Sequence, residues 1–257
     1  MTSMAYFEHQ LGHVAQSKSL YEAALALHRE LGNRYDECGT LWRYGVMNAE
    51  QGRLPEAQAL FEQALQIATE LQDRVIEGEV LTNLAVLHNE LQLPEQATLY
   101  YRRALTLHRE VGNRRWEACV LGELAKLDAA QGHIEEALRT TEQALSIARE
   151  IGDRQVEGAE LSNLGEMLAR VGRIDDARRA LRDSAAVLRP IGARIYLGEA
   201  LCARAELEHR CGDRAAAAAA HAEAQTVASA MHLEPASDLQ RRIDAIGRLL
   251  DGPDAPA

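Results

Sequence analysis

The sequence predicts an all-α protein, an α-solenoid of about six antiparallel helix pairs followed by a C-terminal capping helix. Three observations predict this fold. A short turn phrase recurs every 40 residues, a second turn signal lies half-way between its copies, and small and bulky residues keep the same phase throughout. A single helix pair cannot bury its apolar faces alone, so pairs in register indicate a stacked array.

The turn phrase has four positions: first an apolar residue, second Gly or Gln, third Asn, Asp or Ala, and fourth Arg. Its copies lie at 31–34, 71–74, 111–114, 151–154 and 191–194, and the second signal is Gly12, Gly52, Gln92, Gly132, Gly172 and Gly212. Two turns per repeat leave two helices of about 16 residues each. Glycine can take the left-handed conformation that ends a helix, and the Asn or Asp that follows can cap the next one. Pro55 and Pro94 suit the first turn of second helices.

Small and large side chains alternate between the two helices of each repeat. The small positions of the first helix are Ala5, Gly45, Ala85, Ala125, Gly165 and Ala205. The second helix carries a knob between two small residues, and the knobs are Tyr21, Phe61, Tyr101, Thr141, Leu181 and His221. Small residues let two helices approach closely, and the knob fills the space between them.

This spacing resembles the tetratricopeptide repeat, most clearly at Leu81, Leu84, Ala85, Ala97, Tyr101 and Ala104. The resemblance extends from about residue 4 to residue 234. Its 40-residue period is similar to the long-helix arrays of Pins/LGN-type scaffolds, kinesin light chains and the C-terminal arrays of bacterial regulators. The resemblance implies a right-handed solenoid in which the first helices line the concave surface.

We expect one continuous solenoid domain. Its parts are a truncated repeat 1 at 1–34, repeats at 35–74, 75–114, 115–154 and 155–194, a degenerate repeat at 195–234, a capping helix at 235–250 and a disordered tail at 251–257. The sixth repeat is degenerate because Arg204 occupies an apolar slot and His221 replaces the aromatic knob. Ser237 and Gln240 fit a capping box, and Leu239, Ile243, Ile246 and Leu250 make one apolar stripe.

Composition favours a cytoplasmic chain that binds neither membrane nor nucleic acid directly. The net charge is −11, which repels phosphate backbones and favours a protein or peptide partner with basic character. No apolar run approaches the length of a membrane span, and the N-terminal residues do not read as a signal peptide. Cys38, Cys119, Cys202 and Cys211 lack metal-ligand spacing and are expected to be free thiols.

No catalytic, cofactor or metal motif is recognisable, so we expect a protein that is not an enzyme and has no cofactor. His28 and His108 share a slot and are interpreted as polar helix ends beside the negative dipole. His9 and His13 have helical spacing, but Gly12 is expected to end the helix between them. The Arg of each turn phrase is followed at i+3 by Glu37, Glu77, Glu117 or Glu157, which predicts structural ion pairs.

The expected binding residues lie on the first helices, where side chains vary between repeats. They are Trp42, Arg43, Val46, Glu50, Glu79, Thr82, Asn83, Val86, Asn89, Glu90, Glu123, Lys126, Ser162, Asn163, Glu166, Arg170 and Glu206, with Cys119, Glu199, Cys202 and His209 on the same faces. Asn83 and Asn163 share a slot in which the resemblance implies contact with a peptide backbone, or they are ordinary polar surface. Trp42 is either an aromatic anchor for a partner or a packing residue.

Met4, Phe7 and Leu11 form an apolar stripe on the first helix of the truncated repeat. Because nothing precedes that repeat, we expect this stripe to mediate self-association, with a homodimer as the simplest arrangement, unless the chain is the tail of a longer polypeptide whose missing part covers it. The function we expect is a non-catalytic scaffold that holds a peptide segment of a partner in its groove. The alternative is a sensory module of a bacterial signalling or transcription-regulating system that responds to a small peptide or metabolite.

Overall fold

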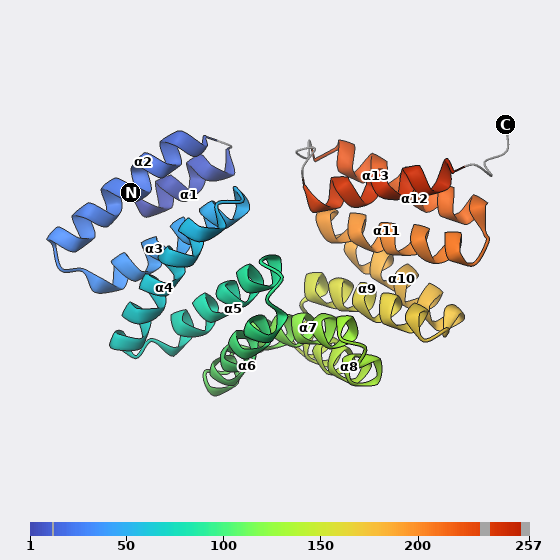
Figure 1. The fold of residues 1–257 in the computed structure, drawn as a ribbon, viewed down its shortest axis with the longest axis horizontal. Helices are drawn as coiled ribbons and strands as arrows, with labels where there is room; N and C mark the ends of the chain where they lie inside the picture. The colour runs from blue at the N-terminus through green and yellow to red at the C-terminus, as the bar shows by residue number, and fades with distance from the viewer. Residues whose placement is uncertain (12, 232–236, 253–257) are drawn as a thin grey trace. The chain divides into compact units, whose positions relative to one another are not determined.

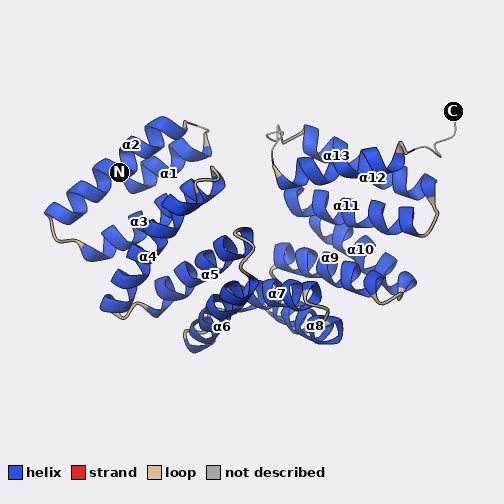
Figure 2. Cartoon of the chain, viewed as in Figure 1, coloured by secondary structure: helices blue, strands red, loops and turns tan. Residues whose placement is uncertain are grey.

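The computed structural model describes residues 1–11, 13–231 and 237–252, and these form α-helices joined by short turns, with no strand among them (Figures 1 and 2). The helices are α1 (Thr2–Gln10), α2 (Val14–Glu30), α3 (Arg34–Glu50), α4 (Leu54–Leu71), α5 (Arg74–Glu90), α6 (Pro94–Glu110), α7 (Arg114–Ala130), α8 (Ile134–Glu150), α9 (Arg154–Arg170), α10 (Ile174–Leu188), α11 (Arg194–Arg210), α12 (Arg214–Ser229) and α13 (Asp238–Leu250). The predicted all-α solenoid of helix pairs with a C-terminal capping helix is confirmed. Gly12, residues 235–236 of the expected capping helix and residues 253–257 of the expected tail lie outside the described residues.

The chain divides into two compact units, Met1–Val120 (unit 1) and Leu121–Ala257 (unit 2), and α7 contributes to both. In unit 1, α1 pairs with α2, α3 with α4, and α5 with α6. In unit 2, α9 pairs with α10 and α11 with α12. Odd-numbered helices also contact one another, as α1 with α3, α3 with α5, α9 with α11, and α11 with α13. We call the surface that these odd-numbered helices form in each unit the first-helix layer.

The turns have the conformations that the sequence predicts. Eight glycines at the turn positions have φ between 64° and 88°, and Gln72 and Gln92 have φ of 55° and 60°. Asn33, Asp73 and Asp153 accept hydrogen bonds from the first free N–H groups of the helices that follow them. Pro94 is the first residue of α6, and Pro55 lies in the first turn of α4. Local residue preferences therefore set where each helix begins and ends.

The predicted small and bulky positions pack together inside each unit. A Cβ on Gly45 would lie 2.6 Å from Cε1 of Phe61, and a Cβ on Gly165 would lie 2.6 Å from Cγ of Leu181. The small positions Ala57, Ala64, Ala97, Ala104, Ala137, Ala144, Ala177, Ala217 and Ala224 are all fully buried. The knob-and-hole prediction is confirmed in both units.

Helix α13 covers the end of unit 2. Leu239, Ile243 and Ile246 are buried in the core that α11 and α12 also form. Ser237 accepts a hydrogen bond from the backbone N–H of Gln240, which is the N-cap contact expected there. Among the described helices, none is both long enough and apolar enough to span a bilayer. The repeat boundaries given above remain predictions.

Candidate functional site

The recurring arginines form structural ion pairs, as predicted. Arg34 donates from Nη1 to Oε2 of Glu37 at 2.8 Å, and Arg29 of the preceding helix donates from Nε to Oε1 of the same carboxylate at 2.8 Å. Burial alone would raise the pKa of Glu37, but the hydrogen bonds from Arg29 and Arg34 outweigh it and hold this pKa below its ordinary value. The same clamp recurs on Glu117 and Glu157, so each of these buried carboxylates is held by one arginine of its own helix and one of the preceding helix.

His108 is a core residue, and its interpretation as a polar helix end was wrong. The ring is fully buried, stacks on Trp116 with centroids 5.8 Å apart, and hydrogen-bonds Thr82 through Nε2 at 3.2 Å. Gly78 makes room for it, because a Cβ there would lie 2.8 Å from Cε1 of His108. The sequence carries a signal for this contact, since Gly78 precedes His108 by the same spacing that separates Gly158 from Leu188, against which a Cβ on Gly158 would also clash.

The predicted residues of α3 are only partly open. Trp42 is half-buried against the core of unit 1, and its Nε1 is buried without a hydrogen-bond partner among the described residues. Arg43 is exposed and lies over the Trp42 ring, 5.3 Å from its centroid. Val46 is half-buried and packs on the same core, whereas Glu50 is exposed and 3.3 Å from His9. Trp42 is therefore mainly a packing residue, and the exposed guanidinium group of Arg43 lies over its ring.

The predicted residues of α5 separate into buried and open groups. Thr82 is buried, donates to the carbonyl oxygen of Gly78 and contacts His108, so it is not available to a ligand. Asn83 is half-buried, and its Nδ2 donates to the carbonyl oxygen of Glu79. Burial raises the pKa of Glu79 above its ordinary value. Further along the helix, the exposed residues are Val86, Asn89 and Glu90.

In unit 2 the first-helix layer begins with a cluster of charged residues on α7 and α9. Lys126 pairs with Glu123 on the same helix. Glu160 is buried in the space that Gly122 leaves beside it, where a Cβ would collide with its carboxyl group. Burial raises the pKa of Glu160 to about 8, although a hydrogen bond from Asn163 at 3.3 Å and the charge of Lys126 act in the opposite direction. Ser162, expected at the surface, is also buried.

Helix α13 places a guanidinium group on this layer. Arg242 donates from Nε and Nη2 to the two oxygens of Glu206 on α11, both at 2.9 Å, and from Nη2 to Glu166 on α9, also at 2.9 Å. Burial opposes its charge, but the hydrogen bond to Glu206 and the charges of Glu166 and Glu206 prevail and raise the pKa of Arg242. One cation thus holds carboxylates from two successive repeats.

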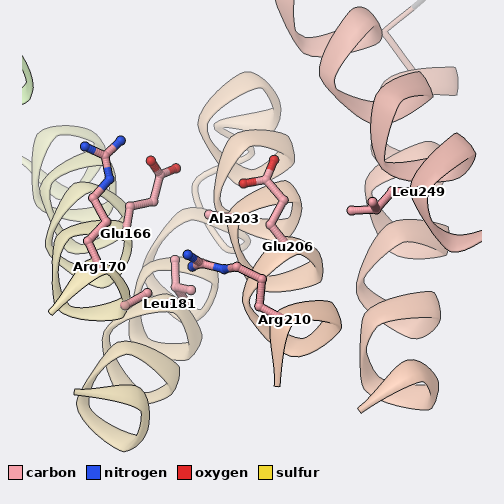
Figure 3. Close-up of a pocket in the computed structure, with 8 residues that line it drawn as sticks. Glu166, Arg170, Leu181, Ala203, Glu206, Arg210 and Leu249 are labelled. Atoms are coloured by element: carbon pink, nitrogen blue, oxygen red, sulfur yellow. The ribbon is translucent and has the colours of Figure 1, made fainter. Parts of the chain in front are cut away.

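A cavity of about 280 Å³ lies beside these carboxylates (Figure 3). Its lining residues are Glu166, Ala169 and Arg170 of α9, Leu181 of α10, Ala203, Glu206 and Arg210 of α11, and Leu249 of α13. In Figure 3 the Arg210 side chain extends from α11 towards Leu181, while Leu249 faces the cavity from α13. The cavity combines an apolar floor with two carboxylates and two guanidinium groups.

Three of these lining residues, Glu166, Arg170 and Glu206, belong to the set predicted from the sequence. The prediction did not include Arg210, Ala203, Leu249 or the nearby Arg242. The repeat carried a signal for two of them, because Arg210 follows Arg170 by one period and Ala203 stands in the slot of Asn83 and Asn163. Arg242 and Leu249 belong to the capping helix, which has no repeat to compare with. Glu199 is exposed on α11, Cys202 is fully buried, and Cys119 and His209 are half-buried.

Met4, Phe7 and Leu11 are all more than half exposed, at 56%, 63% and 55%. The four cysteines are free thiols, of which Cys38 and Cys202 are buried. Burial raises the pKa of Cys38 to about 11 and that of Cys202 to about 12, so both stay protonated at neutral pH. Within residues 1–11, 13–231 and 237–252, no group of three or more His, Cys, Asp or Glu side chains is placed to hold a metal ion.

Several solved structures share this fold. They include BtubC from P. vanneervenii (18% identity, TM-score 0.69, 85% of this chain and 92% of that one), a Rap protein complexed with Competence and Sporulation Factor (17%, 0.75, 85% and 60%) and the quorum sensor NprR from B. thuringiensis in its apo form (16%, 0.71, 100% and 71%). At these identities the likeness shows the fold. A search of the curated proteins finds no match.

The family model of the tetratricopeptide repeat matches residues 1–70, 36–110 and 76–150, and a second model with the same description matches 161–183. These matches extend over more than half of the chain, and the helix pairs, left-handed turn glycines and small-to-bulky packing agree with them. The chain belongs to the tetratricopeptide repeat family.

Proposed function

We propose that this chain is a non-catalytic, cytoplasmic interaction module that binds a peptide segment of a partner protein on its first-helix layer. The observation that carries the proposal is the contrast between the slots of these helices. Buried slots keep small or bulky apolar residues in phase, whereas one open slot changes from the exposed Val86 in unit 1 to the exposed Lys126 and the half-buried Glu206 in unit 2. Positions without a packing role are free to specify a partner. The free thiols support a reducing compartment.

The charge of the layer favours basic side chains on that partner. Glu199 is exposed on α11 and makes no hydrogen bond or ion pair within the described part of the chain, whereas Lys126 forms its ion pair with Glu123. Partial desolvation of its carboxyl group raises the pKa of Glu199, and the charges of Lys126 and Arg242 act against the shift. A basic residue of a peptide beside Glu199 would lower that pKa again and gain a charge-assisted contact.

A random-peptide phage library, with peptides fused to the coat protein through their C-termini, tests the proposal. Selected peptides are expected to lose about tenfold in affinity for Glu199→Lys, the size of one charge-assisted contact. The matched control is Glu142→Lys, which reverses an exposed glutamate of α8 away from the first-helix layer. Equal affinities for the two variants, or no selected peptide at all, would contradict peptide binding on this layer.

A regulatory sensor is the second candidate function. The fold likeness to a Rap protein and to NprR favours it, because the first is described as complexed with Competence and Sporulation Factor and the second as a quorum sensor. In a sensor the peptide must bind one conformation better than another. Small-angle X-ray scattering with and without a selected peptide separates the two candidates: an unchanged scattering profile supports the scaffold, and a changed radius of gyration supports the sensor.

We also propose self-association through Met4, Phe7 and Leu11. Met4 and Phe7 are exposed on α1 and Leu11 is exposed at its C-cap, and this supports the proposal, since contiguous apolar patches on proteins commonly mark contacts. Light scattering is expected to show a mass that rises with concentration and falls to that of the monomer for Phe7→Glu. A concentration-independent monomer for both proteins would overturn this proposal and leave the peptide site unaffected.

A further inference from the structure

Glu166 on α9 and Glu206 on α11 stand one repeat apart in the same slot, and the guanidinium group of Arg242 on α13 holds both (Figure 3 shows the two carboxylates). Its Nε and Nη2 form a fork on the two oxygens of Glu206, each at 2.9 Å, and Nη2 also donates to Oε1 of Glu166 at 2.9 Å. Two parallel N–H···O bonds to one carboxylate give a guanidinium group specific recognition. The structure therefore contains a guanidinium-binding site together with one occupant.

This site is open to solvent. The side chains of Glu166 and Glu206 are 36% and 37% exposed, and that of Arg242 is 30% exposed. Arg178 and Glu208 give a comparison, because Nε and Nη2 of Arg178 also bind one carboxylate across two helices. The Glu208 side chain is only 7% exposed, so an outside group has no access to it. The carboxylates that Arg242 holds can instead be reached without any change in the helices around them.

Apolar packing holds α13 in place without help from Arg242. Leu239, Ile243 and Ile246 are buried, and Gly198 makes room for Leu239, since a Cβ there would lie 2.7 Å from Cδ2 of Leu239. Arg242 is half-buried beside this apolar stripe, and its long side chain can turn towards solvent by rotation about its own bonds. Opening the site therefore requires a change of one side chain, while α13 stays where it is.

The charges around the site are balanced only while Arg242 is in place. Four carboxylates on this part of the first-helix layer face four cations, and these residues are Glu123, Glu166, Glu199 and Glu206 against Lys126, Arg170, Arg210 and Arg242. Glu160 is left out of the count, because burial raises its pKa to about 8 and keeps it mostly protonated at neutral pH. When Arg242 turns away, the remaining groups carry one negative charge in excess, which favours a cation supplied by a partner.

We propose that Glu166 and Glu206 bind the guanidinium group of an arginine of the partner peptide, and that Arg242 fills this site from within the chain until the partner displaces it. This inference rests on the proposed peptide-binding function, and it names the side chain that is recognised and the residue that competes with it. A competitor tied to the protein acts at a high effective concentration. It lowers the apparent affinity of the peptide in proportion to the fraction of time for which the site is open.

The probe is the peptide acetyl-Ala-Arg-Ala-amide, compared with the same peptide in which citrulline, the uncharged isostere of arginine, takes the central place. Heteronuclear NMR of the isotope-labelled full chain is expected to show weak, saturable shifts at the amides of Glu166 and Glu206 with the arginine peptide. Arg242→Gln is expected to raise the affinity for that peptide about tenfold, the gain for a wild-type site that is open about one-tenth of the time. The citrulline peptide should bind both proteins equally weakly.

Arg241→Gln is the matched control. It removes the same charge from the neighbouring residue of α13, whose exposed side chain pairs with Asp238 on its own helix. The affinity for both peptides is expected to stay at the wild-type value. Glu206→Gln combined with Arg242→Gln should cancel the gain, because the carboxylate that accepts the guanidinium fork is then missing.

A measurement on the wild type makes the test independent of how well the variants fold. The Nε–H group of Arg242 donates to Glu206, and its side-chain NMR signal is expected to exchange slowly with water for that reason. A saturating concentration of the arginine peptide should accelerate this exchange, because the displaced guanidinium group faces solvent. The citrulline peptide at the same concentration should leave the exchange unchanged.

Three results would overturn the inference. Arg242→Gln and Arg241→Gln could raise the affinity equally, which would assign the gain to net charge alone. The arginine and citrulline peptides could bind Arg242→Gln equally, or the exchange of the Arg242 Nε–H group could be unchanged by saturating arginine peptide. Library peptides whose binding depends on Glu199, together with an arginine peptide that binds no variant, would refute this inference alone. An arginine peptide that binds Arg242→Gln without any selected library peptide would refute only the library-based test of the proposed function.

Discussion

Unit 1 and unit 2 build their first-helix layers on the same repeat slots but fill two of those slots with different chemistry. One slot is apolar on α3 and α5 and acidic on α9 and α11, and the slot one helical turn later is acidic on α3 and α5 and basic on α9 and α11. The residues are Val46 and Val86 against Glu166 and Glu206, and Glu50 and Glu90 against Arg170 and Arg210. Helix α7, which carries Lys126 and Ala130 in these slots, differs from both pairs. The buried slots behave differently, since Gly45 with Phe61 and Gly165 with Leu181 pack in the same way. Packing constrains the interior of every repeat, whereas the exposed slots are free to differ.

The largest effect is expected where the two units are alike. Gly45→Leu and Gly165→Leu should each lower the free energy of unfolding by about 3 kcal/mol, because a side chain there collides with Phe61 or Leu181. Asn163→Ala, two residues from Gly165 but half-exposed, should lower it by less than about 1 kcal/mol. Urea unfolding monitored by circular dichroism measures both. Equal losses for Gly165→Leu and Asn163→Ala would contradict the close contact at Gly165, and clearly unequal losses for Gly45→Leu and Gly165→Leu would show that the packing of the two units is not shared.

The next effect is specific to unit 2. Glu160 stands in a slot that holds Thr40 and Val80 in unit 1, and burial raises its pKa to about 8. Its folded pKa exceeds its unfolded value of 4.5, so the folded state binds the extra proton between these values. The stability contribution of Glu160 is then complete below pH 4.5 and is lost as the pH rises through about 8.

Glu160→Gln should therefore stabilise the protein above pH 8 by about 2 kcal/mol and flatten its stability between pH 5 and 9. Thermal unfolding across this pH range checks the prediction, with Glu142→Gln on the surface of α8 as the control. An unchanged pH profile for Glu160→Gln would mean that its carboxyl group is ionised and well solvated in the folded protein.

Unit 1 should show the opposite dependence on pH. Burial lowers the pKa of His108, while the charge of Glu117 and a backbone contact at Gly78 raise it less. Because the folded pKa lies below the unfolded value of 6.5, the contribution of His108 is complete above pH 6.5 and is lost as the pH falls below it. The slope is at most about 1.4 kcal/mol per pH unit, the value for one proton. His108→Gln should remove this acid sensitivity in unfolding measured between pH 7 and 5, and a slope that persists would assign it to other groups.

The smallest effect concerns the turns. In unit 2 the turn residue at positions 132, 152, 172, 192 and 212 is a glycine in the left-handed conformation. Two of the corresponding turns in unit 1 instead have Gln72 and Gln92 in that conformation. A left-handed non-glycine residue costs about 1–2 kcal/mol, which the greater flexibility of glycine in the unfolded chain partly offsets. Gln92→Gly should therefore raise the free energy of unfolding by about 0.5–1 kcal/mol. Gln143→Gly, in the middle of α8, should lower it by about 1 kcal/mol, and two losses of equal size would contradict the role of the turn conformation.

The sequence determined the repeat, the helix ends and the packing of helix pairs. These features are encoded locally or recur with a fixed period. Left-handed turn glycines recur with the repeat, and so do N-cap side chains such as Asp73, which accepts from the backbone N–H groups of Val75 and Ile76. The close contact of Gly165 with Leu181 repeats that of Gly45 with Phe61. Because the same residue types recur in phase in six copies, the assignment of each turn and packing position could be checked against the other copies. The fold could therefore be predicted from the sequence alone.

The tertiary structure alone decided which polar side chains remain open to a partner. Thr82 and Ser162 look like surface residues in the sequence but are buried, and His108 lies in the core. Glu166 and Arg242 are 76 residues apart in the chain, and no periodic pattern links a repeat to its capping helix. Burial and ion pairing depend on which surfaces meet after the helices stack. Whether a carboxylate such as that of Glu166 is available to a partner or already held in an ion pair therefore depends on residues that are distant in the sequence.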